Sequence, residues 1–168
     1  CIDELGRAGS KIFSTIDLTS GFWQMKLNEK SRPYTAFTIP GIGSYEWCVC
    51  PMGLKGFPAS FGRLTTFVVR GTPTIMYQDD GLNHSKNHNQ HLIDLQEMFN
   101  RFRGHNLKLN LNKCQFGQTE IEYLGFKITD KGVLPGTDKS AAIKAFQPPT
   151  TLKELRGFLG LTNFFRAS

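Results

Sequence analysis

The stretch that decides the fold is Thr74-Ile75-Met76-Tyr77-Gln78-Asp79-Asp80-Gly81-Leu82. A short run of β-prone residues leads to two adjacent acids and a glycine, and a second short run follows. This order predicts a hairpin, with a strand before the acids, a turn at Asp-Asp-Gly and a return strand over residues 82–85. Two carboxylates that converge at a turn repel each other, and a divalent cation would relieve that repulsion. On these nine residues alone, a plain hairpin turn is the simpler interpretation.

A further acid, Asp17, ends an alternating run over residues 11–18, which is typical of a β-strand. At a strand terminus, Asp17 either caps an Asx-type turn or belongs to a functional site. Phe22 and Trp23 follow it closely and are bulky for a loop. They are either core residues or a wall beside the site that Asp17 serves.

The rest of the chain reads as alternating helices and strands. The helices with the clearest apolar periodicity cover about 57–70 and 87–104, the second with Leu92, Leu95, Phe99 and Phe102 as its apolar stripe. The other predicted elements are a lead-in helix at 3–9, a hairpin over 35–49, a strand over 107–111, a strand over 121–129 bent at Gly125, a turn at 130–132, a helix at 138–146 and a last helix that opens with a capping box at Thr151 and Glu154.

Composition describes a globular chain of 168 residues with a net charge of +6, for which a polyanionic partner is plausible. The four cysteines form no C-x-x-C pair, so neither a zinc site nor a disulfide framework is predicted. Cys48 and Cys50 are expected as small buried residues on one face of a strand. His84, His88 and His91 have spacings that a metal could use, but we interpret them as surface residues. No apolar run reaches the length of a membrane span, and no signal peptide is visible.

In this order the motifs resemble the palm of reverse transcriptases, most closely those of gypsy-like LTR retrotransposons. The resemblance is carried by FSTIDLTSGF at 13–22, TAF at 35–37, PMGLK at 51–55, PASF at 58–61, YQDD at 77–80, LKLN at 107–110, KCQF at 113–116, EYLG at 122–125 and LRGFLGL at 155–161. It implies an α+β polymerase palm, with an antiparallel sheet and helices packed on one face. Residues 1–147 would be the palm with part of the fingers, and 148–168 the start of the thumb helix.

The resemblance also implies the chemistry. Asp17, Asp79 and Asp80 would hold two Mg²⁺ ions, for which Mn²⁺ can substitute, because hard cations prefer carboxylate oxygens. The reaction would be template-directed transfer of deoxynucleotides to a primer 3′-hydroxyl, with one ion activating the hydroxyl and the other stabilising the pyrophosphate.

Other site residues come from the same resemblance. The substrate-binding residues would be Phe22, Met52, Gly53, Lys55, Tyr77 and Gln78. Phe22 would be an aromatic gate that excludes a 2′-hydroxyl. Tyr123, Leu124, Gly125 and Phe126 would form the primer-grip hairpin that holds the primer end near the metals, although the local pattern alone predicts a bent strand there. Gly160 would let the thumb helix approach the duplex.

The implied partners are an RNA or DNA template with its primer, deoxynucleotides, and the RNase H and integrase domains of a parent polyprotein in a cytoplasmic virus-like particle, with no membrane. The chain departs from the family pattern at Gly81 and Asn83, where aliphatic residues are usual, and loss of that packing would loosen the hairpin by ~2 kcal/mol or more. The fingers segment that supplies an Arg and a Lys is not in the sequence. We therefore expect a fragment that polymerises poorly or not at all by itself. Two alternatives remain, a non-catalytic nucleic-acid-binding remnant of a decayed element and, more weakly, an unrelated two-metal nuclease.

Overall fold

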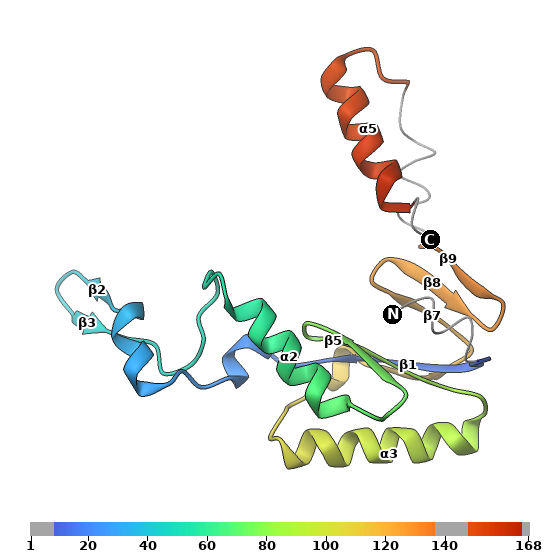
Figure 1. The fold of residues 1–168 in the computed structure, drawn as a ribbon, viewed down its shortest axis with the longest axis horizontal. Helices are drawn as coiled ribbons and strands as arrows, with labels where there is room; N and C mark the ends of the chain where they lie inside the picture. Colours follow the sequence, from blue (N-terminus) through green and yellow to red (C-terminus); the bar gives the residue numbers. More distant parts are fainter. Residues whose placement is uncertain (1–8, 137–147, 166–168) are drawn as a thin grey trace.

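The computed structural model describes residues 9–136 and 148–165. A four-stranded antiparallel sheet in the order β4-β5-β1-β6 forms its centre. Its strands are β1 (Ile12–Asp17), β4 (Thr74–Tyr77), β5 (Asp80–Ser85) and β6 (Gln115–Gln118). Strands β4 and β5 make the predicted hairpin, but the turn lies at Gln78 and Asp79, so Asp80 already belongs to the return strand. Figure 1 shows α3 on one side of this sheet and the β7–β9 strands on the other.

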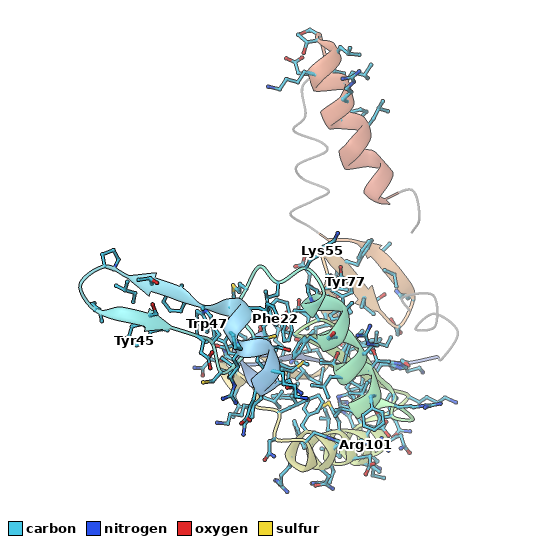
Figure 2. The ribbon with its side chains drawn as sticks, turned by 60° about the vertical axis from the view of Figure 1, so that its left-hand side comes forward. Phe22, Tyr45, Trp47, Lys55, Tyr77 and Arg101 are labelled. Atoms are coloured by element: carbon cyan, nitrogen blue, oxygen red, sulfur yellow. The ribbon has the colours of Figure 1, made fainter. Side chains whose placement is uncertain are left out.

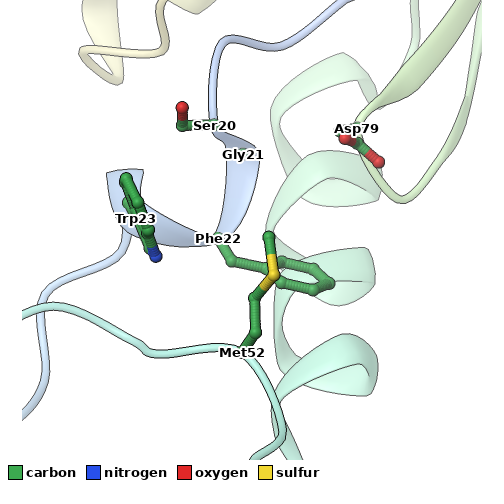
Figure 3. A pocket seen from close by; sticks show the side chains of 6 residues that line it. All are labelled: Ser20, Gly21, Phe22, Trp23, Met52 and Asp79. Atoms are coloured by element: carbon green, nitrogen blue, oxygen red, sulfur yellow. The ribbon is translucent and has the colours of Figure 1, made fainter.

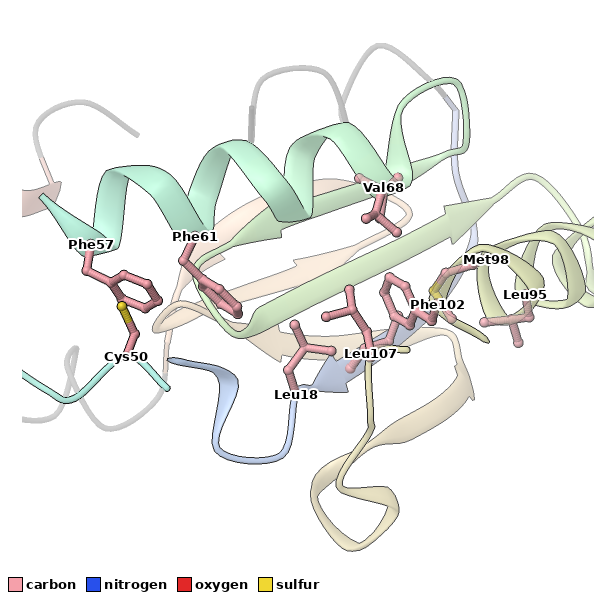
Figure 4. Packing of buried hydrophobic residues seen from close by; sticks show 11 residues of the cluster. Leu18, Cys50, Phe57, Phe61, Val68, Leu95, Met98, Phe102 and Leu107 are labelled. Carbon is pink, nitrogen blue, oxygen red and sulfur yellow. The ribbon is translucent and has the colours of Figure 1, made fainter. Parts of the chain in front are cut away.

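Two helices cover one face of the central sheet, as predicted. Helix α2 (Phe57–Val69) begins with Pro58 in its first turn and ends before Gly71, whose φ is +82°. Helix α3 (His88–Gly104) begins at Asn87, whose side chain accepts a hydrogen bond from the Gln90 amide at 2.9 Å. The core between the helices and the sheet is apolar and aromatic (Figure 4), and its fully buried members include Ile16, Leu18, Phe61, Val68, Met98 and Phe102.

The second face of the central sheet is covered by a three-stranded sheet of β7 (Glu120–Tyr123), β8 (Phe126–Thr129) and β9 (Gly132–Pro135). Phe13 and Leu82 of the central sheet pack there against Ile121, Tyr123 and Ile128. The sequence predicts one strand bent at Gly125, and this prediction is wrong. Leu124 and Gly125 both have positive φ and form a two-residue hairpin turn between β7 and β8.

A β-hairpin of β2 (Phe37–Ile39) and β3 (Gly43–Tyr45) extends away from the central sheet in Figure 1. Two 3₁₀ helices, η1 (Gly21–Gln24) and η2 (Glu29–Thr35), join β1 to this hairpin. Rings on one side of it lie in a row, with Phe37 stacked on Tyr45 at 6.1 Å and tilted against Trp47 at 6.2 Å between centroids. All residues of both strands are exposed.

The last described helix, α5 (Leu152–Phe165), begins as its capping box predicts. The Glu154 amide donates to Thr151 Oγ1, and the Thr151 amide donates back to Glu154 Oε2, both at 3.2 Å. The helices predicted at 3–9 and 138–146 fall mainly or wholly outside the described residues. Within the described part of the chain, no helix is both long enough and apolar enough to cross a bilayer.

Three local predictions are wrong. Residues 107–111 form no strand, because their backbone runs beside the end of β1 through single bonds such as Thr19 N–H to Lys108 O, before a 3₁₀ turn, η3 (Leu111–Lys113). Cys50 is buried as expected, but Cys48 is exposed and lies outside any strand. Half of the apolar stripe predicted for α3 is confirmed, since Leu95 and Phe102 are buried, but His91 and Met98 are buried in the places expected of Leu92 and Phe99. Leu92 is 68% exposed and His91 is 2% exposed, so His91 is a core residue and not a surface histidine.

The space beside the unusual Gly81 is filled from the neighbouring strand. A Cβ atom at Gly81 would lie 2.7 Å from Met76 Sδ, so the methionine thioether occupies the volume that an aliphatic side chain would take. Asn83 is fully buried, and its Nδ2 donates to Thr74 Oγ1 at 2.8 Å. Its Oδ1 has no hydrogen-bond partner among the described residues. Packing at Gly81 is therefore compensated, while Asn83 remains a source of instability.

Candidate active site

The site begins where β1 and β5 end side by side. In the antiparallel register Asp17 pairs with Asp80 and Ile16 pairs with Gly81. Residues paired in this way present their side chains on the same face of the sheet with Cβ atoms about 5 Å apart. The Leu18 amide donates to the Asp79 carbonyl at 2.9 Å, which ties the end of β1 to the turn. The fold therefore brings together the backbones of all three predicted acids, although 62 residues separate Asp17 from Asp79.

The Asp79 side chain lines a cavity of about 130 Å³. The other lining residues are Ser20, Gly21, Phe22, Trp23 and Met52 (Figure 3). Of the predicted substrate-binding residues, the structure thus places Phe22 and Met52 together with one of the acids. The Phe22 ring stands edge-on against Phe57 at 5.2 Å and Phe61 at 5.4 Å between centroids. Phe22 is half-buried: it packs against the core and also forms a wall of the cavity, so both alternatives raised by the sequence hold in part.

The turn before Asp80 is conformationally strained. Gln78 has φ +58°, which a residue with a side chain rarely adopts. Its Oε1 is buried without a hydrogen-bond partner among the described residues. Strained turns that persist are over-determined by the packing around them, and they gather at functional sites. Here the turn packs closely against Gly21. A Cβ at that position would lie 3.0 Å from the Asp79 Cβ and 2.9 Å from Phe61 Cζ.

The acids act on each other electrostatically. Burial raises the pKa of Asp80, the negative charges of Asp79 and Asp17 raise it further, and Lys113 opposes the shift. Lys113 Nζ lies 3.5 Å from Asp17 Oδ2. The Lys113 side chain is largely exposed, so this ion pair adds little stability, but it places one positive charge at the edge of an acidic cluster.

The strand register brings the backbones of the three acids close together, but their carboxylates do not converge on one point. Within residues 9–136 and 148–165, no three His, Cys, Asp or Glu side chains are gathered closely enough to hold a metal ion. Asp17 faces Asp80 and Lys113, while Asp79 faces the cavity. The donor set nevertheless fits a hard divalent cation, because it consists of carboxylate oxygens and because their mutual repulsion, visible at Asp80, favours added positive charge.

The remaining predicted residues lie around this centre or apart from it. Tyr123 reaches it from the second sheet, since its hydroxyl donates to the Asp80 carbonyl at 3.2 Å. Burial raises the pKa of Tyr123, so the phenol stays protonated and remains a donor. Tyr77 and Lys55 are exposed, and Figure 2 shows them with Phe22 and Trp47. Gly53 and Gly160 are exposed and do not line the cavity, and Leu124, Gly125 and Phe126 form the β7–β8 turn and its exit.

Gly21 and Lys113 are site residues that are not among the predicted ones. Both lie inside motifs that carry the family resemblance, SGF and KCQF, so the signal was present. Their roles depend on contacts across the fold, with Gly21 against Asp79 and Lys113 against Asp17, and such contacts have no periodicity in the sequence.

Comparison with known proteins identifies the family. Residues 3–128 match the family described as reverse transcriptase (RNA-dependent DNA polymerase). The chain is 38% identical over 166 residues to the retrovirus-related Pol polyprotein from transposon 297 and 39% identical over 168 residues to that from transposon 412, both of Drosophila melanogaster. These alignments cover 96% and 98% of this chain but only 16% and 13% of the relatives. The chain thus spans about a sixth of their length or less.

Solved structures agree with the sequence relatives. The foamy viral protease-reverse transcriptase in complex with double-stranded DNA superposes with a TM-score of 0.85 at 32% identity, over 93% of this chain and 28% of that one. The same viral protein in complex with an RNA/DNA hybrid gives a TM-score of 0.80 at 32% identity, over 96% of this chain and 23% of that one. The predicted α+β polymerase fold is confirmed, and with the match over residues 3–128 the chain belongs to the reverse transcriptase family.

Proposed function

We propose that this chain is the palm segment of an RNA-directed DNA polymerase from a retrotransposon polyprotein and that it carries the polymerase active site. The observation that supports this most directly is the register of β1 and β5, which sets Asp17 opposite Asp80 with Asp79 in the adjoining turn. Family membership assigns the reaction class, a nucleotidyl transfer. The viral structures bound to double-stranded DNA and to an RNA/DNA hybrid suggest a primed template as the partner.

Asp17, Asp79 and Asp80 would hold two Mg²⁺ ions, which supply charge neutralisation of the triphosphate and activation of the primer hydroxyl. The protein's own contribution is positioning. The Leu18–Asp79 bond and the Tyr123–Asp80 bond hold the backbone on both sides of the acids. Gly21 lets Phe61 and Asp79 pack closely, and the Phe22 ring, fixed by Phe57 and Phe61, would contact the sugar and favour deoxynucleotides.

The test places this chain in the matching segment of the transposon 297 polyprotein, because the chain alone covers only part of its relatives. We expect Mg²⁺-dependent incorporation of dTTP on poly(rA)/oligo(dT). Asp79→Asn should reduce incorporation by more than about 100-fold, since it removes a carboxylate that would bind metal. Asp130→Asn is the matched control, because Asp130 is exposed in the turn between β8 and β9 and should leave the rate unchanged. Equal rates for the Asp79 variant and the control would contradict the proposal.

A non-catalytic nucleic-acid-binding protein is the second candidate. The observation that favours it is that no three acidic side chains converge within the described residues. This candidate predicts that the chimera binds the primed template, as measured by fluorescence anisotropy, but incorporates no nucleotide with either Mg²⁺ or Mn²⁺. The same two measurements therefore separate the two functions.

A further inference from the structure

A buried chain of polar groups crosses the interface between α3 and the central sheet. His91 of α3 lies at its centre, with Nε2 2.6 Å from Ser14 Oγ of β1 and Nδ1 2.9 Å from Ser85 Oγ of β5. Ser14, Ser85 and His91 are each at least 95% buried. These hydrogen bonds therefore join α3 to β1, which ends at Asp17, and to β5, which begins at Asp80.

The outer hydrogen bonds of this network limit where its protons lie. At one end the Gly117 amide of β6 donates to Ser14 Oγ at 3.0 Å, and an amide can only donate. At the other end the Ser85 hydroxyl donates to Asp94 Oδ2 at 2.5 Å, and an ionised carboxylate can only accept. Because the one hydroxyl proton of Ser85 goes to Asp94, Ser85 Oγ must accept the Nδ1–H of His91.

In a neutral imidazole Nε2 then carries no proton. Nε2 accepts the hydroxyl proton of Ser14, which in turn accepts from Gly117. All four hydrogen bonds then run in one direction, from β6 through β1 and α3 to β5 and back to α3. A second proton on His91 would point Nε2–H at Ser14 and leave the buried Ser14 hydroxyl proton without the acceptor that it has in this arrangement.

We propose that His91 is a positioning residue that, as a neutral imidazole with its proton on Nδ1, holds α3 against the two acid-bearing strands and releases them when it takes a second proton. This role of His91 rests on the geometry of the four hydrogen bonds and does not depend on whether the strands serve polymerisation. The outer end of the hydrogen-bond chain opens to a cavity of about 380 Å³, lined in part by Ser85, Gln90 and Asp94, so solvent can reach it.

The surroundings of His91 favour its neutral form. Burial lowers the pKa of His91, and the nearby His88 and His84 lower it further, while Asp94 opposes the shift. The titratable groups that act on His91 are thus His88 and Asp94 on α3 and His84 on β5, whereas β1 and β6 contribute the neutral Ser14 hydroxyl and Gly117 amide. A histidine with a lowered native pKa stabilises the fold above its unfolded pKa of about 6.5, and this stability is lost as the pH falls below that value.

The decisive measurement is the tautomer. Two-bond ¹H–¹⁵N correlation spectra of the 168-residue chain at pH 7.5 should show His91 with Nδ1 protonated and Nε2 bare. Finding the proton on Nε2, or on both nitrogens, would overturn the proposal. In a titration, the protection of α3 amides from hydrogen exchange, corrected for intrinsic rates, should fall in step with the protonation of His91. Unchanged protection while His91 titrates would also overturn it.

Two variants separate positioning from general packing. In Ser14→Ala the donor to Nε2 is gone, so His91 should titrate at higher pH than in the wild-type chain. His91→Gln cannot take a proton, so in this variant the folded-to-unfolded ratio should no longer decline between pH 7.5 and 5.5. For a histidine whose unfolded pKa is about 6.5, that decline is at most about tenfold over this range. The matched control His105→Gln, at an exposed histidine, should keep that decline. If His91→Gln does not fold, the wild-type tautomer and the Ser14→Ala titration still decide the question.

Discussion

Gly21 sets how closely the core and the acid-bearing turn approach each other in the candidate site. Its absent side chain lets Phe61 and the Asp79 turn approach from two elements that are far apart in sequence. Phe61 is fully buried between α2 and the sheet, so it has no room to move aside. A side chain at position 21 must therefore displace either the core or the acid-bearing turn.

We predict that Gly21→Ala lowers the free energy of unfolding by about 1–3 kcal/mol, the usual cost of overpacking a well-filled site. The new Cβ would lie 2.9 Å from Phe61 Cζ and 3.0 Å from the Asp79 Cβ. Urea denaturation followed by circular dichroism measures the change. In the polyprotein chimera the same variant should also slow incorporation, because Asp79 moves with the turn.

The matched control is Gly62→Ala, on helix α2. There the new Cβ would meet only Gln78 Nε2 at 4.0 Å, which is an ordinary contact, and alanine is favoured over glycine inside a helix by about 1 kcal/mol. This control should stabilise the chain. If Gly21→Ala were as stable as Gly62→Ala, the close approach of Phe61 and Asp79 would not be a constraint of the fold.

At the scale of the elements, α3 shows where sequence periodicity succeeds and where it fails. Its limits are predictable, because Asn87 is a good N-cap and the apolar spacing ends near Gly104. Its buried face is predicted only in part, because Leu95 and Phe102 are buried as expected but Leu92 is not. Leu92 is the more hydrophobic residue, but His91 takes the inward position because Ser14 and Ser85 satisfy both of its nitrogens. A pattern based on hydrophobicity cannot detect partners on other strands.

The choice of which α3 residues face the core gives a prediction about stability. Leu92→Gln should change the free energy of unfolding by less than about 0.5 kcal/mol, because Leu92 is mostly exposed. Met98→Ala should cost about 2–5 kcal/mol, because Met98 is fully buried in the core beneath α3. The midpoints and slopes of urea denaturation measure both. A large loss for Leu92→Gln together with a small one for Met98→Ala would mean that the helix is rotated about its axis relative to the structure.

At the scale of the whole molecule, the order of elements and the position of the acids are recoverable from the sequence, since they depend on motifs and turn residues. The hairpin that carries Asp79 and Asp80, the helices α2 and α3 and the capping box of α5 all have local causes. Two other features arise from tertiary contacts, namely the division of the core between two faces of the sheet and the ion pair of Lys113 with Asp17. These features required the structure.

The whole molecule also exposes a large apolar surface on the hairpin arm, which we define as Phe37, Ile39, Ile42 and Tyr45. Exposed clusters of this kind promote association of soluble proteins. We predict that the 168-residue chain self-associates at micromolar concentration and binds a hydrophobic dye. The double variant Ile42→Lys with Tyr45→Thr should be more nearly monomeric in sedimentation velocity, with the unfolding midpoint unchanged, because these side chains lie outside both cores.

The control is Leu111→Gln. Leu111 is 66% exposed, about as much as Ile42 at 67%, but it lies away from the arm, so this variant should leave association as it is. A wild-type chain that sediments as a monomer, or equal effects of the two variants, would show that the arm is not the surface through which this molecule associates.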